Sequence, residues 1–498
     1  MGSQQGTAPA ADDRRWLWAL GLGLAALLAA RIAALPLNGT DLFFDEAQYW
    51  AWSLAPDFGY YSKPPLIAWL IHGATTVCGH GEACVRLPSP IIHTLTALVI
   101  FLIGRRLYGT ATGVVSALTF ATLPGVSLSA GIISTDVPLL FFWALALYAL
   151  IVLRETTGWG PALILGLALG GGLNAKYAMI WFVLCLGIYL AVTPRERVLL
   201  KDPRLWVAIA IGVALIMPNV LWNQAHKFAT FSHTADNANW QGSLLNPGKA
   251  LEFFGAQFGV FGPILFASLL VVTWRAWRQG VPPPDRLLLS FALPVLVIIT
   301  MQAFISRAHA NWAAVSYVSA TVLVVATLIR NIEWAWLRRS MILHVLLLLA
   351  LVAGTIFAGR FALPGGTDPF SRTLGWKEIA DATRKELVAA REAGRPFAAV
   401  ITDDRSITAE LLYYMRDEPT PVLAWRDGPA PRDHFELTRP YEAGTPGPAL
   451  LVSIGKASPT LIARFQQSRA LEARKLPAGA GRPRTVIFTA LEGLKERN

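Results

Sequence analysis

Eleven long apolar runs, separated by short polar segments, constrain the fold of this chain more than any other feature. A helix that crosses a membrane needs about 20 predominantly apolar residues, and most of the runs are close to that length. The runs cover residues 16–37, 88–104, 110–130, 135–153, 159–173, 177–193, 205–222, 250–273, 287–304, 311–329 and 341–362. Charged residues make up 15% of the chain, against about 25% in soluble domains. The sequence therefore predicts an α-helical polytopic membrane protein with about 11 to 13 transmembrane helices.

The basic residues predict how these helices are oriented. The net charge of +11 could indicate nucleic-acid binding, but the basic residues sit in short runs between apolar segments, so we expect no nucleic-acid partner. With a cytoplasmic N-terminus, about fifteen Lys and Arg residues fall in inner loops and about six in outer loops, as the positive-inside rule requires. The first run is too long for the apolar core of a signal peptide, and we expect it to remain as a span. The C-terminal segment is then expected outside the cytoplasm.

The composition changes near residue 363, where long apolar runs stop and charged residues become frequent. Periodicity and β-branched content predict helices at 376–393, 405–416 and 458–468, and strands at 397–402, 419–425, 448–454 and 485–491. Helices that alternate with strands are typical of a small α/β domain. We predict a transmembrane domain over 1–363 and a soluble α/β domain over 364–498, the latter serving substrate capture or stability.

Two adjacent acids, Asp45 and Glu46, follow the first apolar run in the segment LFFDEAQYWAWSLAPDFGYYSKPPLIAWL. Acids this close to the hydrocarbon are costly and usually have a function. Asp45 could act as a general base that takes a proton from an acceptor hydroxyl, with Glu46 shaping the field around it. The alternative is structural, because such a pair could cap the helix that begins near Ala47.

A lysine and three tyrosines in the same segment predict binding of a lipid-linked sugar. The flexible ammonium of Lys63 could reach a phosphate oxygen, although a lysine that merely extends to the membrane surface is the alternative. Tyr49, Tyr60 and Tyr61 lie among tryptophans, and an aromatic belt is typical of a membrane surface. We expect these tyrosines to contact the sugar and the prenyl neck.

Asp136 and Lys176 are two further charged residues at the ends of apolar runs. Asp136, in GIISTDVPLLFFW, is interpreted as an active-site acid or, equally, as part of a plain helix start. Lys176 follows three glycines in GGGLNAKYA, and a cation at that depth is expected to meet an anion such as phosphate. Asp136 or Glu46 could instead be its structural partner.

Two later outer segments add candidate binding residues. His226 and His233 lie in the polar and aromatic segment 221–240, and Arg307 and Asn311 lie in SRAHANW. Arg307 suits bidentate phosphate recognition, with extension to the membrane surface as its alternative. The irregular His and Asp spacing of 221–240 does not match a metal site, and isolated histidines are more often hydrogen-bonded. We therefore expect headgroup and sugar contacts.

Cys78 and Cys84, in VCGHGEACVR, are predicted to form a disulfide outside the cytoplasm. Two free thiols near the membrane edge are the alternative. A Cys-x5-Cys metal site with His80 matches no common zinc spacing.

Taken in order, these motifs resemble those of the C-type (GT-C) membrane glycosyltransferases, in the bacterial branch related to protein O-mannosyltransferases and to the aminoarabinose transferases that modify lipid A. The resemblance covers residues 16–360 and rests on the segments FFDEAQYWAWS, GYYSKPPLIAWL, CVRLPSP, ISTDVPLLFFW, GLNAKY and PNVLWNQAHKFATF. It implies inverting transfer of a sugar from a polyprenyl-phosphate donor at the periplasmic face of the inner membrane. Asp45 then resembles the catalytic acid of the first outer loop, Lys63 the donor-phosphate lysine, and Asp136 the acid of the second outer loop.

Our hypothesis is an inverting glycosyltransferase that acts as a monomer, with membrane lipids around it and lipid A or another envelope molecule as acceptor. We predict no cofactor, with a divalent metal as the alternative because family members differ in metal use. A protein O-mannosyltransferase is the nearest alternative function. A flippase for lipid-linked sugars is less favoured, because ionisable residues gather on one side and mid-span charges such as Arg31 are scarce.

Overall fold

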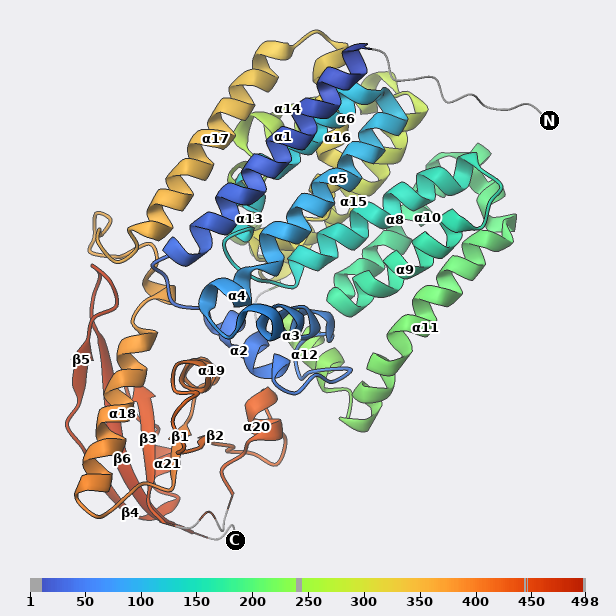
Figure 1. Ribbon diagram of the computed structural model, residues 1–498. Coiled ribbons are helices and arrows are strands. Elements are labelled where there is room, and N and C mark those ends of the chain that lie inside the picture. Colours follow the sequence, from blue (N-terminus) through green and yellow to red (C-terminus); the bar gives the residue numbers. More distant parts are fainter. Residues whose placement is uncertain (1–10, 239–243, 443–444, 446, 496–498) are drawn as a thin grey trace. The chain divides into compact units, whose positions relative to one another are not determined.

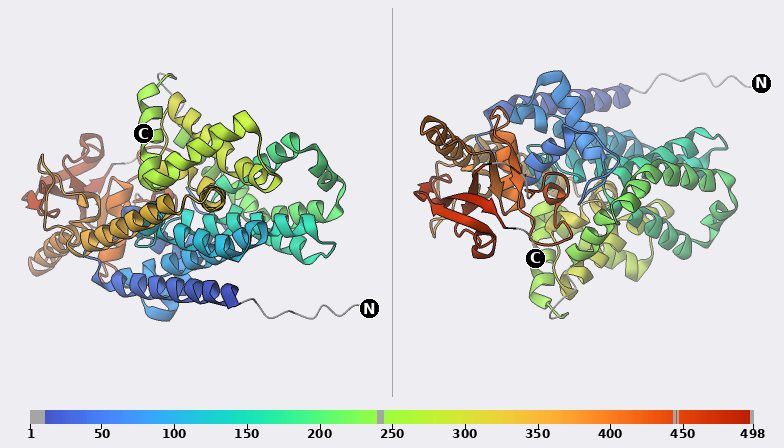
Figure 2. Two further views of the ribbon diagram at one scale, coloured as in Figure 1. Left: turned by 90° about the horizontal axis from the view of Figure 1, so that it is seen from above. Right: turned by 90° about the horizontal axis from the view of Figure 1, so that it is seen from below.

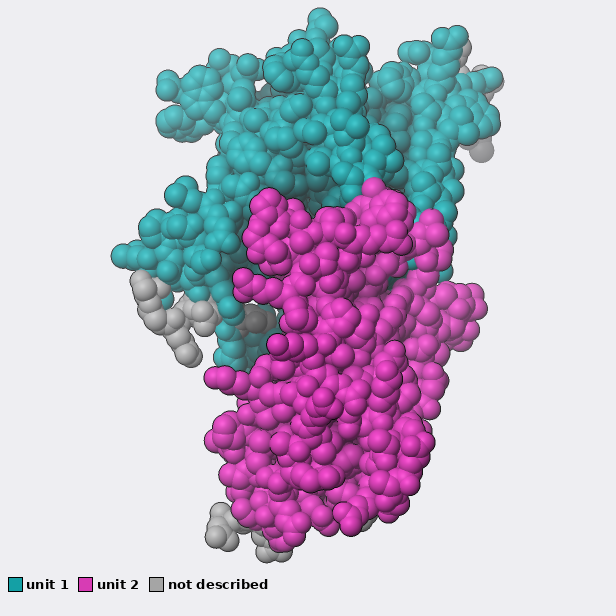
Figure 3. Space-filling model, turned by 90° about the vertical axis from the view of Figure 1, so that its left-hand side faces the viewer, with its two compact units in different colours: residues 1–35, 63–67, 86–351 teal, residues 36–62, 68–85, 352–498 magenta. Residues whose placement is uncertain are grey.

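The computed structural model describes residues 11–238, 244–442, 445 and 447–495 (Figure 1). The chain forms two compact units (Figure 3). Unit 1 consists of Met1–Leu35, Lys63–Ile67 and Arg86–Leu351, and unit 2 of Pro36–Ser62, Ala68–Val85 and Val352–Asn498. The segment that carries Asp45 thus belongs to the same unit as the C-terminal residues.

Unit 1 is helical, as the apolar runs predict. Its helices are α1 (Ala11–Ala34), α5 (Pro88–Tyr108), α6 (Thr110–Thr122), α7 (Pro124–Ser129), α8 (Asp136–Glu155), α9 (Gly160–Ala175), α10 (Trp181–Val192), α11 (Pro203–Ala225), α12 (Ala229–Ala238), α13 (Pro247–Val260), α14 (Pro263–Gln279), α15 (Pro283–Ile305), α16 (Ser316–Arg330) and most of α17 (Trp334–Ile356). Short 3-10 turns lie at Tyr177–Ile180, Pro194–Lys201 and Ala310–Ala313. The predicted fold class is confirmed.

The described part of the chain has fewer helices that are long and apolar enough to cross a membrane than the eleven spans that the sequence predicts. Within the described residues, six helices are long and apolar enough to cross a membrane, or up to seven if the bent pair α13 and α14 counts as one span. Helices α6, α9 and α16 are shorter apolar helices. The predicted run 110–130 is divided because Pro124 begins a new helix, α7.

One predicted span, 250–273, is wrong as a continuous helix. The chain bends by 115° between α13 and α14. At the bend Gly262 has φ of +89° and Pro263 occupies the first turn of α14. A glycine at positive φ and a proline at a helix start both interrupt a helix, so the apolar run is broken although its composition stays uniform.

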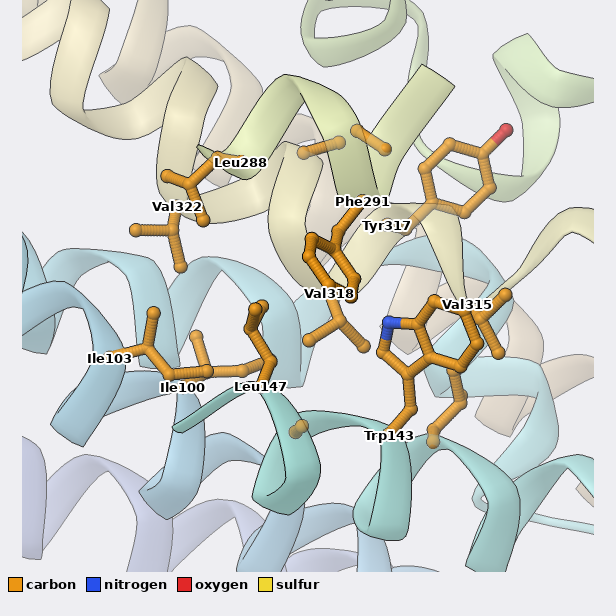
Figure 4. Close-up of a cluster of buried hydrophobic side chains, with 14 of the residues drawn as sticks. Ile100, Ile103, Trp143, Leu147, Leu288, Phe291, Val315, Tyr317, Val318 and Val322 are labelled. Atoms are coloured by element: carbon orange, nitrogen blue, oxygen red, sulfur yellow. The ribbon is translucent and has the colours of Figure 1, made fainter. Parts of the chain in front are cut away.

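The helices of unit 1 pack side by side, with α9 along α11 and α5 along α6 and α8 (Figures 1 and 2). Gly166 and Gly170 let α9 approach α11 closely, since a Cβ at Gly166 would lie 2.7 Å from Cβ of Ile211. Small residues four apart are a common way for membrane helices to pack. Figure 4 shows part of the apolar core, to which α5, α8, α15 and α16 contribute Ile100, Ile103, Trp143, Leu147, Leu288, Phe291, Val318 and Val322.

Unit 2 combines helices from both ends of the chain with one sheet. The helices are α2 (Phe44–Ser53), most of α3 (Leu66–Cys78) and of α4 (Glu82–Arg86), α18 (Trp376–Glu392), α19 (Arg405–Tyr414), α20 (His434–Thr438) and α21 (Pro459–Ile462). The strands are β1 (Ala399–Thr402), β2 (Val422–Ala424), β3 (Ala449–Ile454), β4 (Phe465–Ala470), β5 (Arg474–Leu476) and β6 (Arg484–Leu494).

The sheet has the order β2-β1-β3-β6-β4, and β5 also pairs with β6. Strand β1 is parallel to β2 and β3, whereas β6 is antiparallel to β3, β4 and β5. Side chains alternate between two apolar clusters, so that Val400 and Leu450 pack with α18 and α19 while Ile401 and Leu451 pack with Phe465. Both faces of the sheet are therefore covered, as an α/β domain requires.

The predicted helix over 458–468 is wrong beyond its first turn. Helix α21 ends at Ile462, and the strand β4 follows. After Phe465 every residue of β4 is exposed, so the segment lacks the apolar alternation that identifies a strand. Pairing with β6 imposes the strand instead.

Candidate functional site

Asp45 lies in the first turn of α2 and is bound by an arginine from the C-terminal part of unit 2. Oδ1 of Asp45 accepts a hydrogen bond from Nη1 of Arg405 at 3.1 Å. The same nitrogen donates to Oε1 of Gln48 at 3.1 Å. The side chain of Asp45 is 36% exposed. Its carboxylate is thus oriented by Arg405 and still open to a reactant.

Glu46 has a different role from Asp45, although the two acids are adjacent. It is buried, and its Oε2 accepts a hydrogen bond from the backbone N–H of Phe43 at 2.9 Å. A glutamate at the third helical position that binds the backbone before the helix is part of a capping box. The structural alternative from the sequence therefore applies to Glu46, and Asp45 is the partly exposed acid of the pair.

Two of the three predicted tyrosines are packing residues. Tyr49 is buried beside Trp52, and Tyr60, which is 2% exposed, stacks on Trp52 with ring centroids 4.6 Å apart. The hydroxyl of Tyr60 lies 3.2 Å from the carbonyl oxygen of Trp52. Tyr61 is half-buried and donates to the carbonyl of Pro431 at 2.9 Å. Tyr49 and Tyr60 thus pack within the segment in this structure, and the expected sugar contacts stay a prediction.

A buried polar network anchors the residues before α2. Asp41 accepts a hydrogen bond from the backbone N–H of Trp376 at 2.8 Å, and Nζ of Lys377 lies 3.4 Å from Asp41 and 2.9 Å from Glu82. The hydroxyl of Tyr414 donates to Glu82 at 2.5 Å. Burial raises the pKa of Asp41, while the Trp376 N–H and the charge of Lys377 oppose the rise. These contacts tie the start of α2 to α18 and α19.

Asp136, Lys176 and Asn311 form a second polar cluster, in unit 1. Nζ of Lys176 lies 2.7 Å from Oδ1 of Asp136, and Nδ2 of Asn311 donates to Oδ2 at 2.6 Å. Both oxygens of Asp136 are thus used by side chains from other elements. Of the two partners that the sequence suggested for Lys176, the structure has Asp136.

Glycines explain how Lys176 reaches Asp136. A Cβ at Gly171 would lie 2.5 Å from the ring of Phe142 in α8, and one at Gly172 would lie 2.6 Å from Met179. The absence of a side chain at Gly171 lets the end of α9 approach α8, and its absence at Gly172 leaves room for Met179, which follows Lys176. Gly171 and Gly172 therefore let the chain follow the path that brings Lys176 to Asp136.

The histidine segment is organised by hydrogen bonds and ring stacking. The ring of His226 stacks on Trp222 at 4.0 Å, and its Nδ1 lies 2.8 Å from the carbonyl oxygen of Trp222. His233 is half-buried in α12. Their sugar and headgroup contacts stay a prediction. Residues 239–240 of the segment lie outside the described residues.

Lys63 and Arg307 remain predicted phosphate-binding residues. Both belong to unit 1, where Lys63 is half-buried and Arg307 is exposed. The backbone carbonyl of Arg307 accepts a hydrogen bond from Gln302 at 3.3 Å. Because Asp45 belongs to unit 2, the shared cavity expected for Asp45 and Lys63 also stays a prediction.

Cys78 and Cys84 are joined by a disulfide that closes the turn between α3 and α4. Cys185 is a buried free thiol in α10. Across the residues that the structure describes, no group of three or more His, Cys, Asp or Glu side chains could hold a metal ion.

Sequence reasoning missed Arg405, the residue bound to Asp45. The two lie 360 positions apart, and Arg405 has no local motif beyond Asp404, which caps α19 by accepting hydrogen bonds from Ser406 and Ile407. The one available signal was an arginine at the start of a predicted helix in a segment that should share a side of the membrane with Asp45.

Comparison with known proteins agrees with the fold and with these motifs. Residues 62–222 match the family of dolichyl-phosphate-mannose-protein mannosyltransferases. The lipid A galacturonosyltransferase RgtD of Rhizobium johnstonii is 37% identical over 427 residues, which are 85% of this chain and 88% of that protein.

Two further proteins resemble the chain less closely in sequence. The undecaprenyl phosphate-alpha-4-amino-4-deoxy-L-arabinose arabinosyl transferase 2 of Pseudomonas fluorescens is 29% identical over 222 residues, or 40% of each protein. The crystal structure of ArnT from Cupriavidus metallidurans in the apo state has a TM-score of 0.65 at 14% identity and covers 94% of this chain and 97% of its own. The resemblance inferred from the sequence motifs is confirmed, and the chain belongs to the C-type (GT-C) family of membrane glycosyltransferases.

Proposed function

We propose that this glycosyltransferase moves a sugar from a polyprenyl-phosphate donor to a glycolipid acceptor of the lipid A type. The observation that carries the proposal is the 37% identity to a lipid A galacturonosyltransferase over 88% of that protein's length. The name of the Pseudomonas fluorescens relative supports the polyprenyl-phosphate donor.

Asp45 is the proposed general base. Its exposed carboxylate takes the proton of an acceptor hydroxyl while the hydroxyl oxygen attacks the anomeric carbon of the sugar. The bond from that carbon to the phosphate oxygen breaks, its electron pair stays on the polyprenyl phosphate, and the anomeric configuration inverts. Arg405 holds the carboxylate in one orientation through its 3.1 Å hydrogen bond, which limits the motion needed to reach the reacting geometry.

Cations are proposed to bind the donor phosphate. Lys63 is the first candidate, with Arg307 as a second contact. Lys176 is already neutralised by Asp136 in this structure, so we assign Lys176 and Asp136 a joint role in shaping the site in unit 1. Asn311 completes this role by binding the second oxygen of Asp136.

The similarity to a bacterial lipid A galacturonosyltransferase supports a location in the bacterial inner membrane, and the positive-inside distribution supports an orientation with the reacting residues at the periplasmic face. We propose that the protein acts as a monomer.

The proposal is tested with purified protein in lipid nanodiscs, a polyprenyl-phosphate donor with a labelled sugar, and lipid A. We expect label on lipid A together with an equal amount of free polyprenyl phosphate. Donor that is consumed without labelled lipid A would contradict the acceptor class. In sealed vesicles, donor that crosses the bilayer unconsumed would identify a flippase.

A protein acceptor is the second candidate, because residues 62–222 match a family described by protein mannosyltransfer. Ser- and Thr-containing peptides in place of lipid A test this candidate in the same assay. Labelled peptide with unlabelled lipid A would favour it.

A further inference from the structure

Two arginines of unit 2 gather around the aromatic ring that precedes Asp45. The guanidinium carbon of Arg405 lies 5.1 Å from the ring centroid of Phe44, and that of Arg372 lies 5.6 Å from the same centroid and 4.9 Å from that of Phe43. Arg372 is exposed and lies in the 3-10 turn Ser371–Thr373. An aromatic face attracts a cation and holds its guanidinium plane in place.

Most hydrogen-bond donors of these two guanidinium groups are unused. A guanidinium carries five N–H donors. Nη1 of Arg405 binds Asp45 and Gln48, whereas Nε and Nη2 have no acceptor among the residues that the structure describes. The side chain of Arg372 likewise has no hydrogen-bond acceptor within the described part of the chain, where its contacts are the two rings.

Asp433 is a second acid that interacts electrostatically with Arg405. Its Oδ1 accepts hydrogen bonds from the backbone N–H groups of Phe435 and Glu436 at 2.7 and 3.0 Å, at the start of α20. Burial raises the pKa of Asp433, against the effect of these N–H groups and of Arg405. Since Asp433 caps α20, Asp45 is the carboxylate that pairs with Arg405 among the described residues, and the side chain of Arg372 contacts the two rings. A positive charge remains beside Asp45.

We propose that Arg372 and Arg405 form a binding site for an anionic oxygen group of a substrate, either a carboxylate or a phosphate monoester, next to Asp45. The inference rests on the proposed function and extends it to a class of substrate. The planar edge of a guanidinium matches both anions with two parallel hydrogen bonds. The anion would come from the carboxylate of a uronic acid on the donor or from a phosphate group on the glycolipid acceptor. Binding it here places its sugar within reach of Asp45.

The test uses the full chain in nanodiscs and the variants Arg372→Gln and Arg405→Gln. Arg469→Gln is the matched control, because Arg469 is an exposed arginine of unit 2 in the strand β4. Arg405→Lys keeps the positive charge but removes the planar guanidinium group. It is a conservative variant that is expected to fold if Arg405→Gln does not. Melting temperatures and size-exclusion profiles establish that each variant is folded.

The kinetic arm compares two matched substrate pairs. Donors carry a uronic acid or the corresponding neutral hexose, and the acceptor is lipid A with or without its phosphate groups. Each Gln variant should lower kcat/KM for the anionic member of one pair by roughly tenfold to a hundredfold, the worth of a charge-assisted hydrogen bond. For Arg372→Gln the neutral member should change less than about threefold, and so should both members for the control variant. Arg405→Gln also removes the hydrogen bond that orients Asp45, so it should lower kcat/KM for the neutral member as well, with a further loss of roughly tenfold for the anionic member. Arg405→Lys should fall between wild type and Arg405→Gln.

The pair that responds identifies the source of the anion, the donor sugar or the acceptor phosphate. An equal loss for charged and neutral members, or no loss in either Gln variant, would overturn the proposal. A binding arm works without turnover: free galacturonate or inorganic phosphate should raise the melting temperature of wild type more than that of the Arg372→Gln/Arg405→Gln double variant, and galactose should not distinguish them. If wild type transfers neither sugar, the proposed function fails, and this arm still decides the anion site. Equal shifts in both proteins would refute it.

Discussion

At the scale of single residues, the three candidate acids differ in how the protein binds them. Asp136 is largely buried and both of its oxygens are occupied, and Glu46 is used to cap α2. Asp45 is held by one arginine nitrogen and remains partly exposed. A reactant needs access to the base, and of these three carboxylates Asp45 is the one that combines fixed orientation with exposure.

The pair of Asp136 and Lys176 is expected to matter for stability. Breaking a poorly exposed pair leaves a charge without a partner, so Asp136→Asn or Lys176→Met should each lower the free energy of unfolding by about 2 to 4 kcal/mol. The double variant should cost less than the sum of the two, as a double-mutant cycle in mixed micelles would measure. Lys249→Met is the control, because Lys249 pairs with Glu252 on the surface and should change stability by at most about 1 kcal/mol. Additive losses at Asp136 and Lys176 would contradict a coupled pair.

The sequence predicted the acids of the site better than their partners. Asp45 and Asp136 are recognisable because acids next to apolar runs are rare, and the glycines before Lys176 mark an unusual approach. Arg405 and Asn311 lie 360 and 175 positions from the acids that they bind. No local pattern specifies such distant partners, and they require the fold.

At the scale of elements, close helix packing is the feature that positions the site in unit 1. Helix α9 carries Lys176 just beyond its C-terminal end, and glycines hold it against α11 on one side and α8 on another. The glycines of α9 thus allow the close helix packing that positions Lys176.

Gly166→Ala tests this packing. The added Cβ would lie 2.7 Å from Cβ of Ile211 and 2.8 Å from the carbonyl oxygen of Ala208, so α9 and α11 must separate, at a cost of about 1 to 3 kcal/mol. Gly187→Ala in α10 is the matched control, because nothing lies within 4 Å of its added Cβ and alanine favours helix. The melting temperature of the solubilised protein should fall for Gly166→Ala and hold or rise for Gly187→Ala. Equal values would contradict the packing argument.

Helices and strands were predictable from the sequence where the apolar pattern of a segment matches the structure that the segment adopts. The helices α18 and α19 and the strands β1, β2, β3 and β6 coincide with predicted segments because their apolar residues follow a regular period. Strand β4 was not predicted, because its residues after Phe465 are all exposed and show no apolar alternation. The break between α13 and α14 was missed because Gly262 and Pro263 interrupt a run that stays apolar on both sides.

At the scale of the whole molecule, the chain passes between the two units several times. Unit 2 takes 36–62 and 68–85 from the early chain and joins them to 352–498. A boundary at residue 363 does not describe this grouping, which arises from contacts such as the hydrogen bond from Tyr413 to the carbonyl of His80 at 2.7 Å. The division into 1–363 and 364–498 remains a prediction for folding experiments.

A chain that ends at residue 363 should lose activity. Without α18 and α19, Asp41 and Asp45 lose Lys377 and Arg405, and the buried rings around Trp50 lose Tyr413. We expect no measurable transfer and rapid protease cleavage within 38–62 of the membrane-inserted chain. Full activity together with resistance of residues 38–62 to protease would show that the C-terminal residues are not needed to order this segment.

The central claim is that Asp45 accepts the proton of the acceptor, and Asp45→Asn tests it most directly. An asparagine oxygen can still accept the hydrogen bond from Arg405, so the fold should persist while the base is lost. Measured as release of polyprenyl phosphate by purified protein in nanodiscs, kcat should fall by about 10² to 10⁴ while KM changes little. A folded Asp45→Asn variant with kcat within about threefold of wild type would contradict the account.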